Sequence, residues 1–217
     1  MRPRRIFRVY ENLSLMTRRT LLAATLSASL RAERIFNGNN LTGWKQHGNG
    51  LWTVEAGAIV CRFDPQKPGP GHLLTQRNFA DFRLQLEFWI TKGGNSGIFL
   101  RQPLREFGTR GATKPAQRPT DGVEVQICYV EEKNLTGAIY NKSKPTSLRG
   151  AEERWTSMAI ECQGPRVTVA VDGQTVNDYS PLASPRGVIG FQMHGQLEHD
   201  HVVRFRQIEL EEFEPLG

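Results

Sequence analysis

Two pairs of polar residues are spaced so that each pair shares one face of a predicted strand. Glu124 and Gln126 alternate with valine and isoleucine, and Gln192 and His194 alternate with phenylalanine and methionine. Side chains two positions apart on a strand point the same way, roughly 7 Å apart, so each pair presents a titratable group beside an amide. Because histidine titrates nearest neutrality and carboxylates accept protons, His194 or Glu124 is the predicted general acid or base.

Arg101 is the third catalytic candidate, at the end of the strand-like segment 97–101. A guanidinium fork can hold a carboxylate or polarise a ketone or enolate oxygen. Each of these candidates also has a structural interpretation. Arg101 could form a salt bridge with a neighbouring acid such as Glu124, the pair Glu124 and Gln126 could face solvent, and His194 could be a turn residue before Gly195.

Polar and aromatic residues around these candidates are predicted to bind substrate: Gln126, Gln192, Asn95, Ser96, Glu87, Trp89, Tyr140 and Lys142. Glu87 and Trp89 share the polar face of one strand, and the Trp89 ring could stack on a sugar or cover the sandwich. Asn95 and Ser96 belong to a glycine-rich turn that they could also simply shape. Tyr140 and Lys142 are expected at the rim of the cleft.

No cofactor is assigned from the sequence, and a divalent metal is left open. The segment 198–201, Glu-His-Asp-His, contains two histidines that could ligate a metal. A solvated polar turn is the favoured interpretation of His199 and His201. Metal ligands are therefore not predicted.

The elements that position these residues are predicted to be strands. Apolar residues alternate with polar ones in 82–90, 123–129 and 189–194, and 51–61 is typical of two strands joined by a tight turn. Asp172-Gly173 lies between alternating runs, which predicts a two-residue hairpin turn. The alternation in 203–210 changes phase, which predicts a β-bulge near Arg206-Gln207.

Many short strands separated by turn signals favour an all-β, antiparallel jelly-roll sandwich, and the length suits one domain over 33–217. Two long polar connections, 102–121 and 131–153, interrupt the strands and are expected to be functional or disordered.

The net charge of +6 comes from the first 32 residues, which contain seven arginines and one glutamate. The remaining residues carry 21 basic and 21 acidic side chains and are neutral overall. A neutral body has no general positive field for polyanions, so no nucleic-acid partner is expected.

Residues 1–32 are interpreted as an N-terminal extension and export signal, with Met16 as a second candidate start. Segment 17–22, Thr-Arg-Arg-Thr-Leu-Leu, precedes a short apolar stretch and resembles a twin-arginine signal. The alternative is a disordered basic tail. The expected location is exported, periplasmic or secreted, in a bacterium. No segment has the length and hydropathy of a membrane span.

The three cysteines, 61, 128 and 162, lack CxxC spacing, which argues against a structural zinc site. One disulfide with a free thiol and three buried thiols both remain open. The second is slightly favoured because twin-arginine substrates are typically exported already folded.

Several motifs, in this order and at this spacing, resemble the DUF1080 family, also called the 3-keto-disaccharide hydrolase domain. They are Ile35-Phe-Asn-Gly-Asn-Asn-Leu-Thr-Gly-Trp44, Leu73-Leu-Thr75, Phe79-Ala-Asp-Phe82, Gly94-Asn-Ser-Gly-Ile-Phe-Leu-Arg101, Gly122-Val-Glu-Val-Gln-Ile127, Thr136-Gly-Ala-Ile-Tyr140, Gly187-Val-Ile-Gly-Phe-Gln-Met-His-Gly195 and Val203-Arg-Phe-Arg-Gln-Ile208. The chain departs from the family where Tyr129 replaces a common acidic residue and where Glu153-Arg-Trp155 replaces Gly-Glu-Trp.

The resemblance implies a concanavalin-like jelly roll and action on oligosaccharides oxidised at C3, described for some members as 3-keto-glycoside 1,2-lyase and 3-keto-2-hydroxy-glucal hydratase activity. A C3 ketone acidifies the C2 proton, so a base can remove it, the C1 substituent can leave, and water can add to the enone. Paired glycosidase carboxylates are then unnecessary. Functional coupling to a sugar 3-dehydrogenase is expected. Two alternatives remain: a non-catalytic carbohydrate-binding module, and a conventional glycoside hydrolase with Glu87 as the partner of Glu124.

Overall fold

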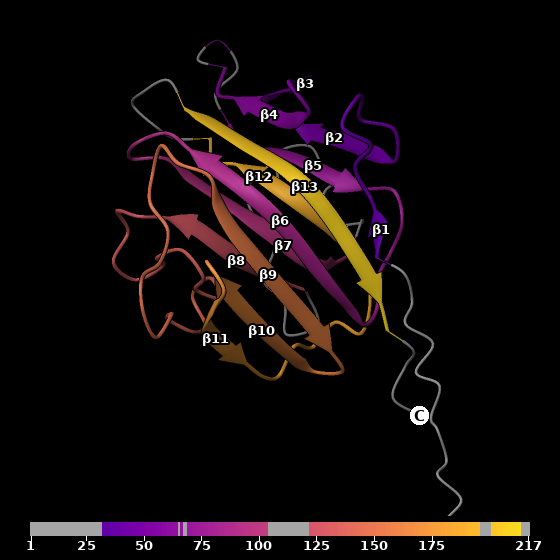
Figure 1. Cartoon of the computed structure of the whole chain (residues 1–217), viewed down its shortest axis with the longest axis vertical. Helices are drawn as coiled ribbons and strands as arrows, with labels where there is room; N and C mark the ends of the chain where they lie inside the picture. The colour runs from indigo at the N-terminus through magenta and orange to yellow at the C-terminus, as the bar shows by residue number, and fades with distance from the viewer. Residues whose placement is uncertain (1–31, 65, 67–68, 104–121, 196–200, 214–217) are drawn as a thin grey trace, which may run out of the picture.

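A computed structural model describes residues 32–64, 66, 69–103, 122–195 and 201–213. Over these ranges the chain forms strands joined by turns and contains no helix. The strands assemble into two antiparallel sheets that lie one against the other as two layers (Figure 1). The predicted all-β jelly-roll sandwich is therefore confirmed.

The first sheet has eight strands, in the spatial order β11 (Gln174–Tyr179), β10 (Arg166–Val171), β9 (Thr156–Gln163), β6 (Phe82–Ile90), β13 (Val202–Glu212), β4 (Ala58–Arg62) and β3 (Leu51–Glu55), with β1 (Glu33–Arg34) paired to β13. The second sheet has five, in the order β2 (Trp44–Gly48), β5 (Gly71–Thr75), β12 (Val188–Met193), β7 (Asn95–Gln102) and β8 (Val123–Cys128).

The core lies between the sheets and follows directly from the alternation of the strands. In β6 every second residue is buried, and the apolar side chains of β8 and β12 meet them from the other sheet. The ring of Phe191 stacks between Phe205, with centroids 4.0 Å apart, and Trp44, with centroids 5.1 Å apart. Each buried side chain of this size contributes roughly 1.5–3 kcal/mol, so the core fixes which face of each strand turns outward.

The predicted local irregularities are present. Asp172 and Gly173 both have positive φ, 46° and 73°, and join β10 to β11 as a hairpin. The register of β13 against β6 shifts between Arg206 and Glu209, where Gln207 has φ 52°, which confirms the β-bulge.

The long connection 131–153 is ordered. Its part 136–140 runs beside β8 and bonds to it through the backbone, for example from Tyr140 N to Glu124 O at 2.9 Å. The amide of Asn177 donates to Gly137 O and Ser143 O and anchors this segment to β11. Most of the other long connection, 104–121, lies outside the described residues.

All three cysteines are buried free thiols, so the alternative with a disulfide does not hold. Burial raises the pKa of the Cys162 thiol to about 12 and that of Cys61 still further. The predicted export signal, residues 1–32, lies outside the described residues except for residue 32. Among the residues that are described, no helix is long and apolar enough to cross a membrane.

Candidate active site

The outer face of the five-stranded sheet carries a row of polar side chains that crosses all five strands. Val125 and Ile127 point into the core, so the alternate residues of β8, including Gln126, face outward. Gly97 pairs with Gln126, while on the far side of β12 His72 pairs with both Gln192 and His47.

Phe191 stands opposite Ile98, so continuing the β12–β7 register places Gln192 opposite Gly97. The row therefore reads His47, His72, Gln192, Gly97 and Gln126.

Gly97 leaves the space in which the side chain of Glu124 lies. A Cβ atom at position 97 would stand 2.1 Å from Glu124 Oε1 and 2.8 Å from Cγ and Cδ. The Glu124 side chain therefore crosses from β8 over β7, and its carboxylate comes within about one strand spacing, roughly 5 Å, of the strand that carries Gln192. This is how an edge-strand residue reaches the middle of the face.

Two amide oxygens on this face are buried and accept no hydrogen bond from any residue that the structure describes: Gln126 Oε1 and Gln192 Oε1. The Gln126 side chain is oriented by Asn95, because its Nε2 donates to Asn95 Oδ1 at 2.8 Å. Leaving a buried acceptor without a donor costs about 1–3 kcal/mol. A ligand with hydroxyl or N–H groups aimed at this face would supply the missing donors.

His72 is buried and lies beside the ring of Phe99, with centroids 5.3 Å apart. Burial, and the charge of neighbouring His47, lower the pKa of His72 to about 4, so its imidazole is neutral at pH 7. A neutral imidazole has one N–H donor and one acceptor nitrogen. Leu74 also flanks the row, because a Cβ at Gly190 would stand 2.4 Å from Leu74 Cδ2. Polar groups and an apolar wall therefore meet on this face.

The sequence interpretation missed His47, His72 and the role of Gly97. The available signal was a histidine alternating with apolar partners in 71–75, a polar residue that faces away from the core. Assigning it to the site also needs the order of the strands, which the sequence does not contain.

His201 contacts the start of β7, next to the candidate site. Its Nδ1 lies 3.0 Å from Thr91 Oγ1 and its Nε2 lies 2.9 Å from Asn95 O, and its ring packs against Gly94, where a Cβ would be 2.5 Å from Cε1. Burial, and secondarily the charge of His194, lower the pKa of His201 to about 4, although the bond to Asn95 O opposes this shift. The expectation that His201 lies in a solvated turn was wrong, and His199 lies outside the described residues.

His194 follows the end of β12 and is half-buried. It lies close enough to His201 for its charge to lower the pKa of His201. His194 lies two residues beyond Gln192, directly after the last residue of β12. The structure therefore places four predicted residues on or at the end of one face: Glu124, Gln126, Gln192 and His194. Asn95 joins them through its bond to Gln126.

Arg101 is placed elsewhere, at the end of the sandwich. It is 1% exposed, and its guanidinium donates to Asp81 Oδ1 at 2.7 Å, to Gly164 O at 2.7 Å and to the carbonyl oxygen of Ala80. The φ angle of Arg101 is +50°, which breaks the strand alternation and turns the side chain away from the face that carries Phe99. This geometry favours the salt-bridge alternative, with Asp81 and not Glu124 as the acid.

Ser96 also has a structural contact. Its hydroxyl donates to Gln192 O at 2.6 Å and ties β7 to β12 on the buried side of the sheet.

Glu87 and Trp89 lie across the sandwich from Glu124. Both belong to β6 of the eight-stranded sheet and face outward, while Leu86 and Phe88 fill the core. Glu87 Oε2 accepts from Arg206 Nε at 2.6 Å, and the guanidinium of Arg204 lies 4.7 Å from the centroid of the Trp89 ring. The structure does not bring these two residues together with the other candidates.

Tyr140 borders the polar face, and Lys142 lies further out. Ile139 forms a bridge with Val125 and is in the core, so the neighbouring Tyr140 turns toward the face of Glu124. Lys142 is exposed in the turn that its own N–H closes on Ile139 O at 2.8 Å. Among the described residues, no three histidine, cysteine or acidic side chains gather as a metal site.

The pattern of strands and motifs corresponds to a known family. A family model described as "3-keto-alpha-glucoside-1,2-lyase-like domain" matches residues 31–211. The chain belongs to this family. The resemblance inferred from the motifs is therefore confirmed, and it extends over nearly the whole described structure.

One curated relative is a Bacteroides thetaiotaomicron protein named 3-keto-disaccharide hydrolase, 36% identical over 73 residues. The match covers 30% of this chain and 25% of that protein, so the chain matches about a quarter of the relative's length. Together with the family, this name supports a carbohydrate-processing enzyme.

Solved structures of similar fold are more distant in sequence. A Parabacteroides distasonis structure with a provisional glycosyl hydrolase name has a TM-score of 0.64 and 21% identity, covering 84% of this chain and 94% of that one. A Bacillus subtilis protein with a galectin-like fold has a TM-score of 0.61 and 12% identity, covering 84% and 95%. At these identities the likeness shows the fold alone.

Proposed function

We propose that this protein cleaves 3-keto-glycosides by removing the C2 proton, expelling the C1 substituent and adding water to the resulting enone. The substrate class comes from the family and from the relative's name. The observation that carries the mechanism is the carboxylate of Glu124, held over Gly97 between the unsatisfied amide oxygens of Gln126 and Gln192.

In this proposal Glu124 is the base. The carboxylate takes the proton from C2, and the electron pair of the C2–H bond moves toward the C3 ketone, whose oxygen gains negative charge. A neutral N–H donor nearby stabilises that oxygen, and His72 is held in the neutral form at pH 7 by its burial. His194 remains the alternative base. Arg101 has no role in this step because its guanidinium is engaged at the end of the sandwich.

In the second step the enolate re-forms the ketone, the C1–C2 double bond forms, and the C1–O bond breaks with its electron pair on the leaving sugar. Protonated Glu124 or His194 supplies the proton to that oxygen. Water then adds at C1 and a proton returns to C2, which gives the free 3-keto sugar. The amide oxygens of Gln126 and Gln192 would accept from sugar hydroxyls and fix the ring over the carboxylate.

The test compares a 3-keto disaccharide with its unoxidised parent, in D₂O, with proton NMR at C2 and product analysis. Glu124→Gln keeps the shape of the side chain and should lower turnover and C2 exchange by at least a hundredfold, while Glu87→Gln on the opposite sheet should leave both unchanged. Failure to turn over the keto substrate, with or without divalent metal, would refute the activity. Normal C2 exchange in Glu124→Gln would instead assign the base to another residue.

The position of Glu87 bears on the conventional glycoside hydrolase. That mechanism needs two carboxylates on the two sides of one glycosidic bond. Glu87 is separated from Glu124 by the full thickness of the sandwich. A carbohydrate-binding module would bind intact sugar without turnover, and the same experiment separates it from the enzyme.

Two wider proposals accompany the reaction. The substrate must arise from oxidation of a sugar at C3, so a sugar 3-dehydrogenase would supply it. Residues 1–32, with their twin-arginine pattern, would direct the protein out of the bacterial cytoplasm. Fusing this segment to a reporter and comparing it with an Arg18→Lys/Arg19→Lys version tests the second proposal.

A further inference from the structure

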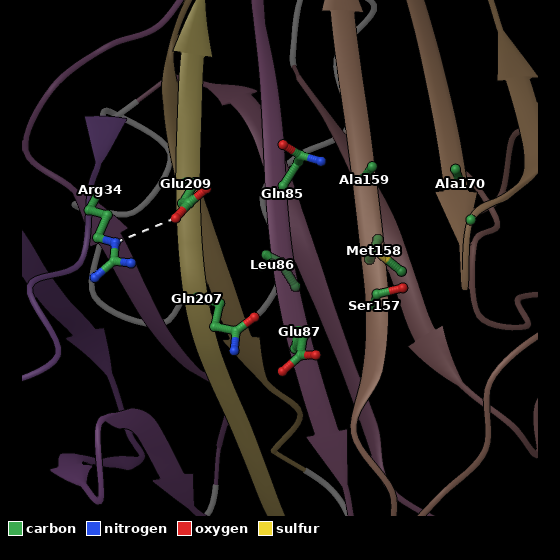
Figure 2. Close-up of a pocket in the computed structure, with 11 residues that line it drawn as sticks. Arg34, Gln85, Leu86, Glu87, Ser157, Met158, Ala159, Ala170, Gln207 and Glu209 are labelled. Atoms are coloured by element: carbon green, nitrogen blue, oxygen red, sulfur yellow. Dashed lines mark hydrogen bonds and ion pairs between the residues drawn. The ribbon is translucent and has the colours of Figure 1, made fainter. Parts of the chain in front are cut away.

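A groove of about 560 Å³ opens on the outer face of the eight-stranded sheet, across the sandwich from Glu124 (Figure 2). Residues that line it include Gln85, Glu87, Ser157, Ala159, Ala170 and Gln207. None of them takes part in the reaction proposed above. The volume falls within the range of about 300–1,000 Å³ that is usual for small-molecule sites.

The hollow exists because two long side chains are followed by two small ones along one row of paired strands. Glu209 pairs with Gln85, Gln85 with Ala159, and Ala159 with Ala170. The first two side chains rise from the sheet as a wall, while the last two contribute only methyl groups and leave a low apolar floor (Figure 2). The next row, Arg206, Glu87 and Ser157, closes the groove along its length.

The β-bulge of β13 adds a third polar side chain to the wall. It sets two residues of β13, Gln207 and Ile208, opposite the single residue Leu86 of β6; Ile208 enters the core and Gln207 remains exposed. Figure 2 shows Gln207 between β13 and β6, above Glu87. The amides of Gln85 and Gln207 have no hydrogen-bonding partner within the described part of the chain.

The charges of the groove are already compensated. Glu87 Oε2 accepts from Arg206 Nε at 2.6 Å, and Glu209 Oε1 accepts from Arg34 Nε at 3.4 Å. The guanidinium of Arg206 also lies over the ring of Trp155, 4.0 Å from its centroid. A ligand therefore meets two free amides, one serine hydroxyl and paired ions, a neutral polar surface that selects neither anions nor cations.

We infer that this groove binds a short uncharged oligosaccharide, at a site separate from the catalytic face. Amides and paired carboxylates suit the vicinal hydroxyls of a sugar, and the alanine floor suits the C–H face of its ring. From Glu209 on β13 to Ala170 on β10 the groove crosses three strand spacings, roughly 15 Å, which accommodates two or three sugar units. A peptide is disfavoured because these strands are paired on both sides and offer no free backbone edge.

The experiment titrates the full chain with maltotriose and with cellotriose and follows backbone amide shifts by NMR. The expected shifts are at residues 85, 87, 157 and 207, at millimolar or lower sugar concentration. Ala159→Leu fills the floor and should weaken binding at these residues at least tenfold. Gln207→Gly keeps the positive φ of the bulge and removes one amide, which should weaken it about threefold to tenfold.

Two controls separate this site from the other face. Thr168→Leu places the same leucine side chain on the same outer face, one row away from the groove, and should leave binding unchanged. Glu124→Gln should also leave the groove shifts unchanged, so failure of the catalytic proposal does not affect this one. The inference is overturned if neither trisaccharide shifts these amides, if the shifts survive Ala159→Leu, or if trigalacturonate binds there as tightly as the neutral sugars.

Discussion

Replacing Gly97 by alanine tests whether the position of the Glu124 carboxylate matters. The new methyl group would stand 2.1 Å from Glu124 Oε1, whereas a carbon–oxygen contact needs about 3.3 Å. The carboxylate must therefore move by about 1 Å or more. A displacement of that size in a reacting group can lower the rate about a hundredfold, so kcat for a 3-keto disaccharide should fall by roughly that factor.

The fold should tolerate the same change. The clash is with a flexible side chain and not with the backbone, and alanine is favoured over glycine in a strand by about 0.5–1 kcal/mol. The free energy of unfolding, measured by urea titration, should change by less than about 2 kcal/mol. A loss of activity at nearly constant stability is the signature of a displaced catalytic group.

The control is the shorter acid at position 124. Glu124→Asp withdraws the carboxylate by one methylene, so Gly97→Ala should cost far less in that background, and the two changes should not be additive. The reasoning is refuted if Gly97→Ala retains wild-type kcat, or if its effect is the same in both backgrounds. Either result would mean that Gly97 does not act through Glu124.

Three further outcomes follow from buried groups elsewhere. Arg101→Met should lower the free energy of unfolding by about 3–5 kcal/mol, because it leaves Asp81 without its buried partner. The kcat of the folded fraction should stay unchanged. A loss of kcat without a loss of stability would show that Arg101 belongs to the active site. The pKa values of His72 and His201 are about 4 in the folded chain and near 6.5 in the unfolded chain. Between these values the unfolded chain binds more protons than the folded chain does. The free energy of unfolding should therefore fall as the pH drops through this window, by up to about 3 kcal/mol for each histidine. Urea titrations from pH 7 to 4 should show a shallower fall for His72→Gln/His201→Gln than for the wild type, and equal slopes would contradict the assignment. The three buried thiols should react with a thiol reagent at pH 8 only after denaturant is added, and rapid labelling of any one in the native protein would show that it is accessible.

The sandwich could be predicted because alternation, turn chemistry and the bulge are local properties. The same rule correctly placed Glu124 and Gln126 on one face of β8 and Gln192 on the outer face of β12. It could not decide which sheet a strand joins, and so Glu87 was grouped with residues that lie on the opposite layer. That decision depends on contacts between segments far apart in the sequence.

Arg101 shows a second limit of the sequence. A positive φ in a non-glycine residue leaves no compositional mark, and at Arg101 it redirects the side chain from the sheet face to the carbonyl groups at the end of the sandwich. His72 shows the opposite limit, a site residue that the sequence pattern did not indicate. Its strand, 71–75, is short and mostly apolar, and only the pairing of the strands places His47 and Gln192 beside it.

The central place of β13 has a consequence for biosynthesis. β13 is made after all the other described strands, yet it lies between β6 and β4 and also pairs with β1. A chain still on the ribosome can form the β9–β11 meander. The part of the eight-stranded sheet that ends at β6 cannot join the part that begins at β4 until β13, which ends at residue 212, has emerged. Nascent chains should therefore stay sensitive to protease until β13 has left the ribosome, and truncations before β13 should depend on chaperones.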